Sequence, residues 1–169
     1  MRKALKIIDS ISEWAGKTGQ WLCLSLVLLV TYEVIMRYVF NKPSLWPYDM
    51  ACMMGLTLYA LAFAYVLRHK AHVRVDVFYT HLPSRGKAII DILGALILFF
   101  PLVILLTKSS FTWMLSAWSK GETVFLTGWE PPAGPVRTVV MVGFGILALQ
   151  GLAQFIRDIY LLIKGRAYD

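Results

Sequence analysis

The sequence predicts an all-α integral membrane protein with four transmembrane helices, amphipathic segments at the membrane interfaces and both termini in the cytoplasm. Of its 169 residues, 58% are hydrophobic, and the mean hydropathy is +0.63. A soluble domain of this length has too little interior for so much apolar surface. Four apolar runs match the roughly 20 residues that a helix needs to cross a bilayer. The remainder is too short for a separate soluble domain, so we expect residues 1–169 to form one membrane domain.

The N-terminal region predicts a surface helix followed by the first span. Residues 1–18 combine four basic residues with apolar residues at helical spacing. This pattern is typical of an amphipathic helix that lies on the membrane surface. The first span follows at about residues 19–40. Because Tyr32 to Arg37 offers no small-residue cleavage site, we expect an uncleaved helix rather than a signal peptide.

The second and third spans are separated from their neighbours by turn-forming and polar stretches. Two prolines within residues 41–47 end the first span, because proline cannot continue a helix. The second span is expected at about residues 48–67 and the third at about 88–107. Pro101 lies inside the third span and is expected to kink it.

The segment of residues 108–135 is expected to form a periplasmic arm and loop. Its apolar spacing continues through Trp118, which indicates that the third helix extends along the interface as an amphipathic arm. The sequence WEPPAGP, residues 129–135, then indicates an extended or turned stretch. The fourth span follows at about residues 136–156.

The distribution of charge predicts the orientation. The N-terminal segment, the second connection and the tail together carry twelve basic residues, and the other two connections carry five. The positive-inside rule therefore places both termini in the cytoplasm. The six tryptophans lie near the ends of the spans, as in aromatic belts at membrane interfaces. The net charge of +7 forms no basic helical face, so no nucleic-acid partner is expected.

Glu33 and Arg37 are the charged pair closest to the membrane interior. Glu33 lies about 12 Å below Asn41 along the first helix, counting ~1.5 Å per residue. An ionised group at that depth is costly unless it pairs or faces protein, and Arg37 is four residues away on the same helical face. Three interpretations stay open: a self-satisfied anchoring pair, a docking point for another membrane subunit, and part of an ion or proton pathway.

The second connection, residues 68–87, contains three polar residues that suggest a metal site: His69, His72 and Asp76. Two histidines in a basic loop are too few for a convincing zinc site, so no metal is expected. The alternatives are a solvated loop with local pairing, and a contact with a partner subunit or anionic lipids. Asp49 and Asp91 each lie in the first turn of a span, where a carboxylate complements the helix dipole. No catalytic triad, P-loop or nucleotide fingerprint is present, so neither an enzyme nor a cofactor is expected.

Two motifs resemble a known family. The first is E-x-x-x-R-Y-V-F-N-K-P-x-x-W, from Glu33 to Trp46, and the second is H-V-R-V-D, from His72 to Asp76. On a four-span chain they resemble the small membrane subunit of TRAP transporters (tripartite ATP-independent periplasmic transporters), the DctQ-like family. Asp49 fills the place of an acidic residue that often follows the tryptophan in this family, although Pro47-Tyr48 departs from the usual pattern.

The resemblance implies a role in a three-part transporter of the bacterial inner membrane. A periplasmic substrate-binding protein captures an organic acid, and a large membrane subunit moves it inward with a sodium gradient. The small subunit is a non-catalytic scaffold that pairs with the large one, and its arm and loop contribute to docking of the binding protein. The chain lacks the broken mid-membrane helices expected where a substrate binds. The residues expected to shape the subunit interface or its support are Glu33, Arg37, Asn41, Pro43, Trp46, Asp49, His72, Arg74 and Asp76.

Two other classes of function stay open at this point. A small channel or carrier formed by self-assembly would need polar residues along a path, and these are scarce. A haem-binding membrane anchor would need histidines on facing spans, whereas all three histidines, at positions 69, 72 and 81, lie in one loop.

Overall fold

The computed structural model describes residues 2–69 and 84–164, and in this part of the chain the fold is all-helical. Four helices are long and apolar enough to cross a membrane, which confirms the predicted fold class. The elements are α1 (Arg2–Tyr38), α2 (Trp46–Arg68), α4 (Ser84–Gly94), a π-helical turn η1 (Ala95–Phe99), α5 (Phe100–Lys120) and α6 (Gly134–Lys164).

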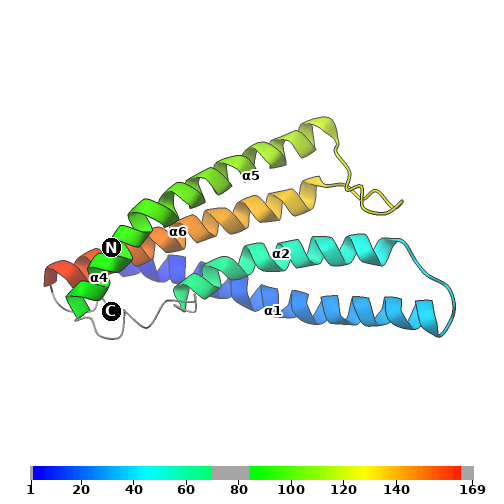
Figure 1. The fold of residues 1–169 in the computed structure, drawn as a ribbon, viewed down its shortest axis with the longest axis horizontal. Helices are drawn as coiled ribbons and strands as arrows, with labels where there is room; N and C mark the ends of the chain where they lie inside the picture. The colour runs from blue at the N-terminus through cyan, green and yellow to red at the C-terminus, as the bar shows by residue number, and fades with distance from the viewer. Residues whose placement is uncertain (1, 70–83, 165–169) are drawn as a thin grey trace.

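The helices form two antiparallel hairpins that pack through α2 and α6 (Figure 1). α1 pairs with α2, and α5 pairs with α6, while α6 also contacts α4 and the N-terminal part of α1. α1 begins and α6 ends at the same end of the bundle, which we call the terminus end. The opposite end, which we call the loop end, carries the connections 39–45 and 121–133.

α1 is one continuous helix, and this differs from the expected division into a surface helix of residues 1–18 and a span beginning at residue 19. Its 37 residues correspond to about 55 Å. Leu5 and Ala15 are buried, and a Cβ added at Gly16 would lie 2.2 Å from the ring of Tyr65. The N-terminal segment therefore packs along the bundle as an extension of the first span, because one side of it is covered by other helices.

The third span contains a π-helical turn next to Pro101 and continues as a helix on both sides of it. The backbone N–H of Phe100 bonds to the carbonyl of Ala95, five residues earlier, and Pro101 has no N–H to donate. The disturbance expected at Pro101 thus takes the form of a π-helical turn. α5 then continues to Lys120, as predicted from its apolar spacing, and ends at Gly121 in the left-handed conformation with φ of 61°.

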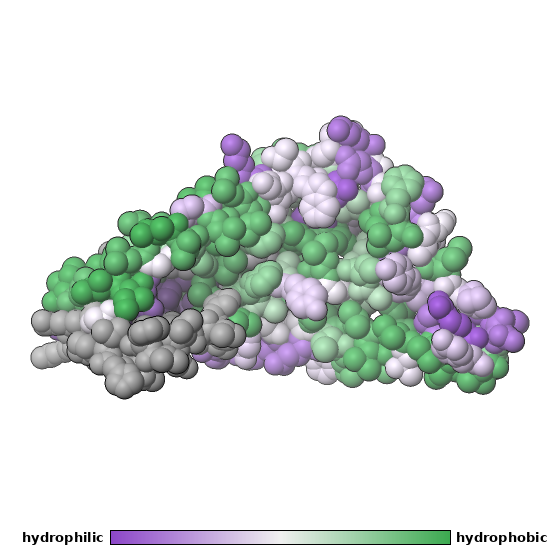
Figure 2. Space-filling model, viewed as in Figure 1, coloured by the Kyte–Doolittle hydropathy of each residue, from purple (hydrophilic) through white to green (hydrophobic). Residues whose placement is uncertain are grey.

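Small residues allow α2 and α6 to approach closely. A Cβ added at Gly143 would lie only 2.6 Å from the carbonyl oxygen of Ala60. Nearby, Ala64, Val103 and Leu147 form a buried cluster that joins α2, α5 and α6. Outside this contact, large apolar side chains cover much of the outer surface (Figure 2), as expected for a chain whose exterior faces lipid or other subunits.

Candidate functional sites

Glu33 and Arg37 form the predicted pair at the loop end of α1. Arg37 Nη2 lies 2.8 Å from Glu33 Oε1, and Arg37 Nε donates to the same oxygen at 3.2 Å. The backbone N–H of Ser44 also donates to this oxygen, at 3.4 Å, so the carboxylate ties the helix to the following loop. The Glu33 side chain is 13% exposed and that of Arg37 is 51% exposed. The other oxygen, Glu33 Oε2, is buried without a partner among the described residues. The pair therefore satisfies one carboxylate oxygen and leaves the other unpaired.

The chain reverses direction immediately after this pair. Asn41 adopts the left-handed conformation with φ of 55°, which asparagine tolerates better than most residues. The N–H of Lys42 bonds to the carbonyl of Met36 at 3.0 Å and closes the end of α1. Pro43 is exposed in the connection, and Pro47 occupies the first turn of α2, where a missing N–H carries no penalty. These residues have a local role in shaping the hairpin.

Trp46 joins three segments through its ring. Its centroid lies 6.1 Å from that of Tyr32 in α1 and 6.4 Å from that of Trp129 in the 121–133 loop. Such aromatic pairs contribute beyond the area they bury. Trp46 therefore links the α1–α2 hairpin to the 121–133 loop at the loop end.

Asp49 does more than complement the dipole of α2. Its side chain is fully buried, and its Oδ2 accepts a hydrogen bond from the hydroxyl of Thr127, 78 residues away. Its other oxygen, Oδ1, is buried without a partner among the described residues. The carboxylate thus holds the 121–133 loop against the start of α2. Nothing in the spacing of the sequence pointed to Thr127.

A second tie holds the beginning of the same loop. Arg137 of α6 donates to the carboxylate of Glu122, and also to the carbonyl of Trp113 at 3.3 Å. Its guanidinium lies 4.4 Å from the centroid of the Trp113 ring, a cation–π contact. The hydrogen bond from the hydroxyl of Ser116, followed by that from Arg137, holds the pKa of the Glu122 carboxyl below its ordinary value of 4.5.

At the terminus end, Asp9 is the centre of a polar network that sequence analysis missed. Its two carboxylate oxygens accept hydrogen bonds from Arg157, and from Gln150 Nε2 at 3.1 Å. Gln150 is fully buried, and its Oε1 accepts a hydrogen bond from the buried Ser12 hydroxyl at 2.7 Å. Residues of α1 and α6 separated by about 140 positions are therefore joined. The only sequence signal was Gln150, a polar residue inside an apolar run.

The same network extends to α2. Arg68 donates to the backbone carbonyl of Asp9 at 2.9 Å and to the carboxylate of Glu13. His69 Nε2 lies 3.3 Å from the same Glu13 oxygen, and its ring lies 4.4 Å from that of Tyr65. Three helices thus meet at one polar cluster, which explains why the first residues of α1 stay with the bundle.

Other residues predicted to support the interface are His72, Arg74 and Asp76, which lie outside the described residues. His69, the first of the residues that suggested a metal, is paired with Glu13. Among residues 2–69 and 84–164, no group of three or more histidine, cysteine, aspartate or glutamate side chains is arranged to hold a metal ion.

Comparison with known proteins agrees with the predicted family. The sequence profile of the DctQ component of tripartite ATP-independent periplasmic transporters matches residues 26–160. The sialic acid TRAP transporter small permease protein SiaQ of Vibrio cholerae serotype O1 is 26% identical over 82 residues. That alignment covers 48% of this chain and 46% of the relative, so the chain spans less than half of the length of the relative it matches. The family match, together with the four membrane-spanning helices, shows that this chain belongs to the DctQ family, the small permease subunits of TRAP transporters.

Proposed function

We propose that this chain is the non-catalytic scaffold of a sodium-gradient-driven TRAP transporter for organic acids. In this proposal it pairs with the large membrane subunit in the bacterial inner membrane, with membrane lipids around it. The relative's name refers to sialic acid, which is one organic acid, and the proposal concerns the wider class. The positive-inside rule supports placing the terminus end, and with it both chain termini, in the cytoplasm.

The observation that carries the scaffold role is the cross-helix polar network at the terminus end. Asp9 is bonded to α6 through Arg157 and Gln150, and its backbone is bonded to α2 through Arg68. A helix bundle fixed in this way suits a subunit that stays still while another moves. The described spans have no discontinuous helices of the kind that bind substrates and ions in secondary transporters; the π-helical turn keeps its helix continuous.

The loop end supports a contribution to docking of a periplasmic binding protein. Phe125 is 74% exposed and Leu126 is 53% exposed. Both lie in the 121–133 loop, whose two sides are joined by backbone hydrogen bonds. Val124 N–H bonds to the carbonyl of Pro131 at 2.8 Å, and Ala133 N–H bonds to that of Glu122 at 2.9 Å. An ordered loop with exposed apolar side chains is a suitable surface for a protein partner.

The test is uptake of a radiolabelled organic acid into proteoliposomes with an inward sodium gradient. We expect uptake only when this chain, the large subunit and the binding protein are all present, and we expect it to cease without the sodium gradient. Uptake by this chain alone would contradict the scaffold role and favour a self-sufficient carrier. Uptake that is unchanged when a proton gradient replaces the sodium gradient would contradict the proposed coupling ion.

The orientation has its own test. A single cysteine introduced at Lys42, in a background in which Cys23 and Cys52 are replaced by serine, should react with a membrane-impermeant maleimide in intact cells. A cysteine at Lys164 should react only after the cells are opened. The reverse pattern would contradict the proposed orientation.

A further inference from the structure

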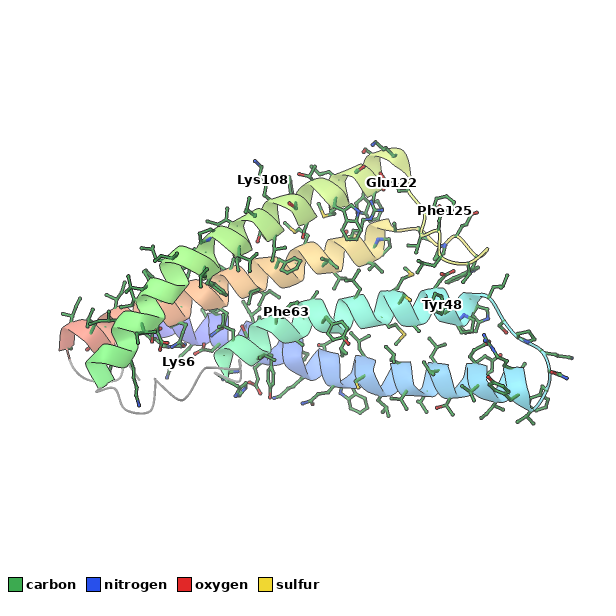
Figure 3. The ribbon with its side chains drawn as sticks, in the orientation of Figure 1. Lys6, Tyr48, Phe63, Lys108, Glu122 and Phe125 are labelled. Carbon is green, nitrogen blue, oxygen red and sulfur yellow. The ribbon has the colours of Figure 1, made fainter. Side chains whose placement is uncertain are left out.

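Lys108 is a lone charged residue on the outer side of α5. Its side chain is exposed and points away from the bundle (Figure 3). The large residues one turn away are apolar and exposed: Ile104 and Leu105 are each 63% exposed, and Phe111 is 45% exposed. Lys108 has no ion-pair or hydrogen-bond partner for its amine among residues 2–69 and 84–164. A cation therefore stands in the middle of an apolar surface.

The helix contacts place Lys108 near the middle of the bundle. Val103 belongs to one buried cluster with Ala64 of α2 and Leu147 of α6, so these residues lie at about one level. Lys108 is five residues closer to the loop end, or about 7.5 Å along its helix. From Ala64, α2 extends about 27 Å toward the loop end to Trp46 and about 6 Å in the other direction to Arg68. Lys108 is thus roughly 13 Å from the level of Arg68 and roughly 20 Å from that of Trp46.

A second contact gives the same depth. Trp118 donates a hydrogen bond to the hydroxyl of Thr138, in the first turns of α6, at 3.0 Å. Lys108 is ten residues, or about 15 Å, from Trp118 along α5. Since the hydrocarbon core is about 30 Å thick, Lys108 is near its centre if α2 crosses it. This differs from the expectation that the third span ends at about residue 107 and is followed by a periplasmic arm, because α5 continues to Lys120 and stays beside α6. Four methylenes are too short to carry the amine from there to either interface.

Other charged groups on the spans do not share this problem. Arg37 and Arg137 lie near the loop end, and they are paired with Glu33 and Glu122. Lys17 lies on the opposite outer helix, one turn from Glu13. Glu13 is paired with Arg68, the last residue of α2, so this level is close to the membrane interface and the Lys17 side chain reaches it. An unpaired intramembrane cation is costly, and such residues face protein or a water-filled path.

We propose that Lys108 pairs with an aspartate or glutamate on a membrane-spanning helix of the large subunit, and that the outer side of α5 is the corresponding interface. This inference rests on the proposed pairing of the two subunits. A second copy of this chain does not supply the carboxylate, because Glu33 is engaged by Arg37 and Asp49 is fully buried beside Thr127. Thr112, one turn from Lys108 and also exposed, adds a polar group to the same side.

The test is recovery of the large subunit with the tagged chain after co-expression and purification in mild detergent. Lys108→Met keeps the length and apolar stem of the side chain but removes the charge, and leaves the partner's carboxylate unpaired. We expect recovery per tagged chain to fall about tenfold, and further for Lys108→Glu, because like charges then meet. Lys108→Arg should retain most of the recovery. Lys17→Met is the matched control, an exposed lysine on the other outer helix, and should leave recovery unchanged.

The thermal unfolding of each variant, purified without the large subunit, separates a docking defect from a folding defect. We expect Lys108→Met to unfold at the same temperature as the wild type or above it, since it removes an exposed charge from an apolar surface. If the wild type recovers the large subunit and both Lys108→Met and Lys108→Glu recover it equally well, the amine faces lipid and the inference is wrong, while the scaffold role stands. If the wild type recovers no large subunit, both proposals are wrong.

Discussion

The two ends of the bundle are held together in different ways. At the terminus end, polar side chains join helix to helix: Asp9 of α1 is bonded to Gln150 and Arg157 of α6. At the loop end, polar side chains join helices to a connecting segment, through Asp49 with Thr127 and through Arg137 with Glu122. The first arrangement fixes the helices relative to one another. The second holds the 121–133 loop against α2 and α6, whose packing on each other does not depend on that loop.

This difference predicts where a mutation will act. Loss of a tie at the terminus end should loosen the whole bundle, because the network there joins α1 to both α2 and α6. Loss of a tie at the loop end should release the 121–133 loop and leave the helices in place. The following variants test this contrast in the isolated chain, purified in detergent.

Removal of the Asp9 carboxylate should have the largest effect. Asp9→Ala leaves Arg157 and the buried Gln150 without their acceptor, and we expect the free energy of unfolding to fall by about 2–3 kcal/mol. The measurement is chemical unfolding followed by circular dichroism. Glu130→Ala, which changes an exposed carboxylate at the loop end, is the control and should alter stability by less than about 0.5 kcal/mol. Equal effects of the two variants would show that the network contributes nothing.

The tie between Thr127 and Asp49 should have an intermediate effect. Thr127→Val keeps the shape of the side chain but leaves both oxygens of a buried carboxylate without a donor, at a cost of about 1–2 kcal/mol. Limited proteolysis of the loop should accelerate while the helix content stays constant. In the double variant Asp49→Ala/Thr127→Val the losses should be less than additive by about 1 kcal/mol. Strict additivity would mean that the two side chains do not interact.

The pair of Glu122 and Arg137 should respond to pH. The pKa of Glu122 is lowered in the folded chain, so its contribution to stability is present above the ordinary value of 4.5 and is lost as the pH falls through the lower folded value. Thermal unfolding should therefore show the wild type above Glu122→Gln at pH 6, with the difference shrinking below pH 4.5. A difference that is the same at pH 6 and pH 3 would contradict the role of the ionised carboxylate.

Arg37→Ala should have the smallest effect on the isolated chain. The side chain is half-exposed and its partner is one turn away, so we expect a loss of about 0.5 kcal/mol or less. Its effect on the complex is a separate matter, because we propose that the pair also contributes to the subunit interface. Normal recovery of the large subunit and normal uptake by this variant would contradict that role.

The sequence was sufficient for the number and order of the spans and for the first reversal of the chain. Apolar runs set the four helices, and Asn41 and the two prolines that follow it set the first reversal, because these signals are local. The continuity of α1 was not predictable. Its first residues present apolar side chains on two sides, Leu5 and Ala15 on one and Ile7 and Trp14 on the other. Contacts with α2 and α6, which lie much later in the chain, decide which side is buried.

The polar ties show the same limit. Glu33 and Arg37 were found because they are four residues apart on one helix, whereas Asp49 and Thr127 are 78 residues apart and share no periodic pattern. A carboxylate in the first turn of a helix is explained equally well by the helix dipole, so its sequence position gave no reason to look for a distant partner.

The π-helical turn of residues 95–99 sets the rotational phase of the third span. A turn of this kind accommodates one residue more than an α-helical turn, so everything after it is rotated by about 100° relative to an uninterrupted helix. The phase after the turn directs Val103 and Ser110 inward and Lys108 outward. Deletion of a single residue within the turn would therefore rotate α5 by about 100° and turn Val103 and Ser110 away from the bundle interior, while leaving the length of the helix almost unchanged.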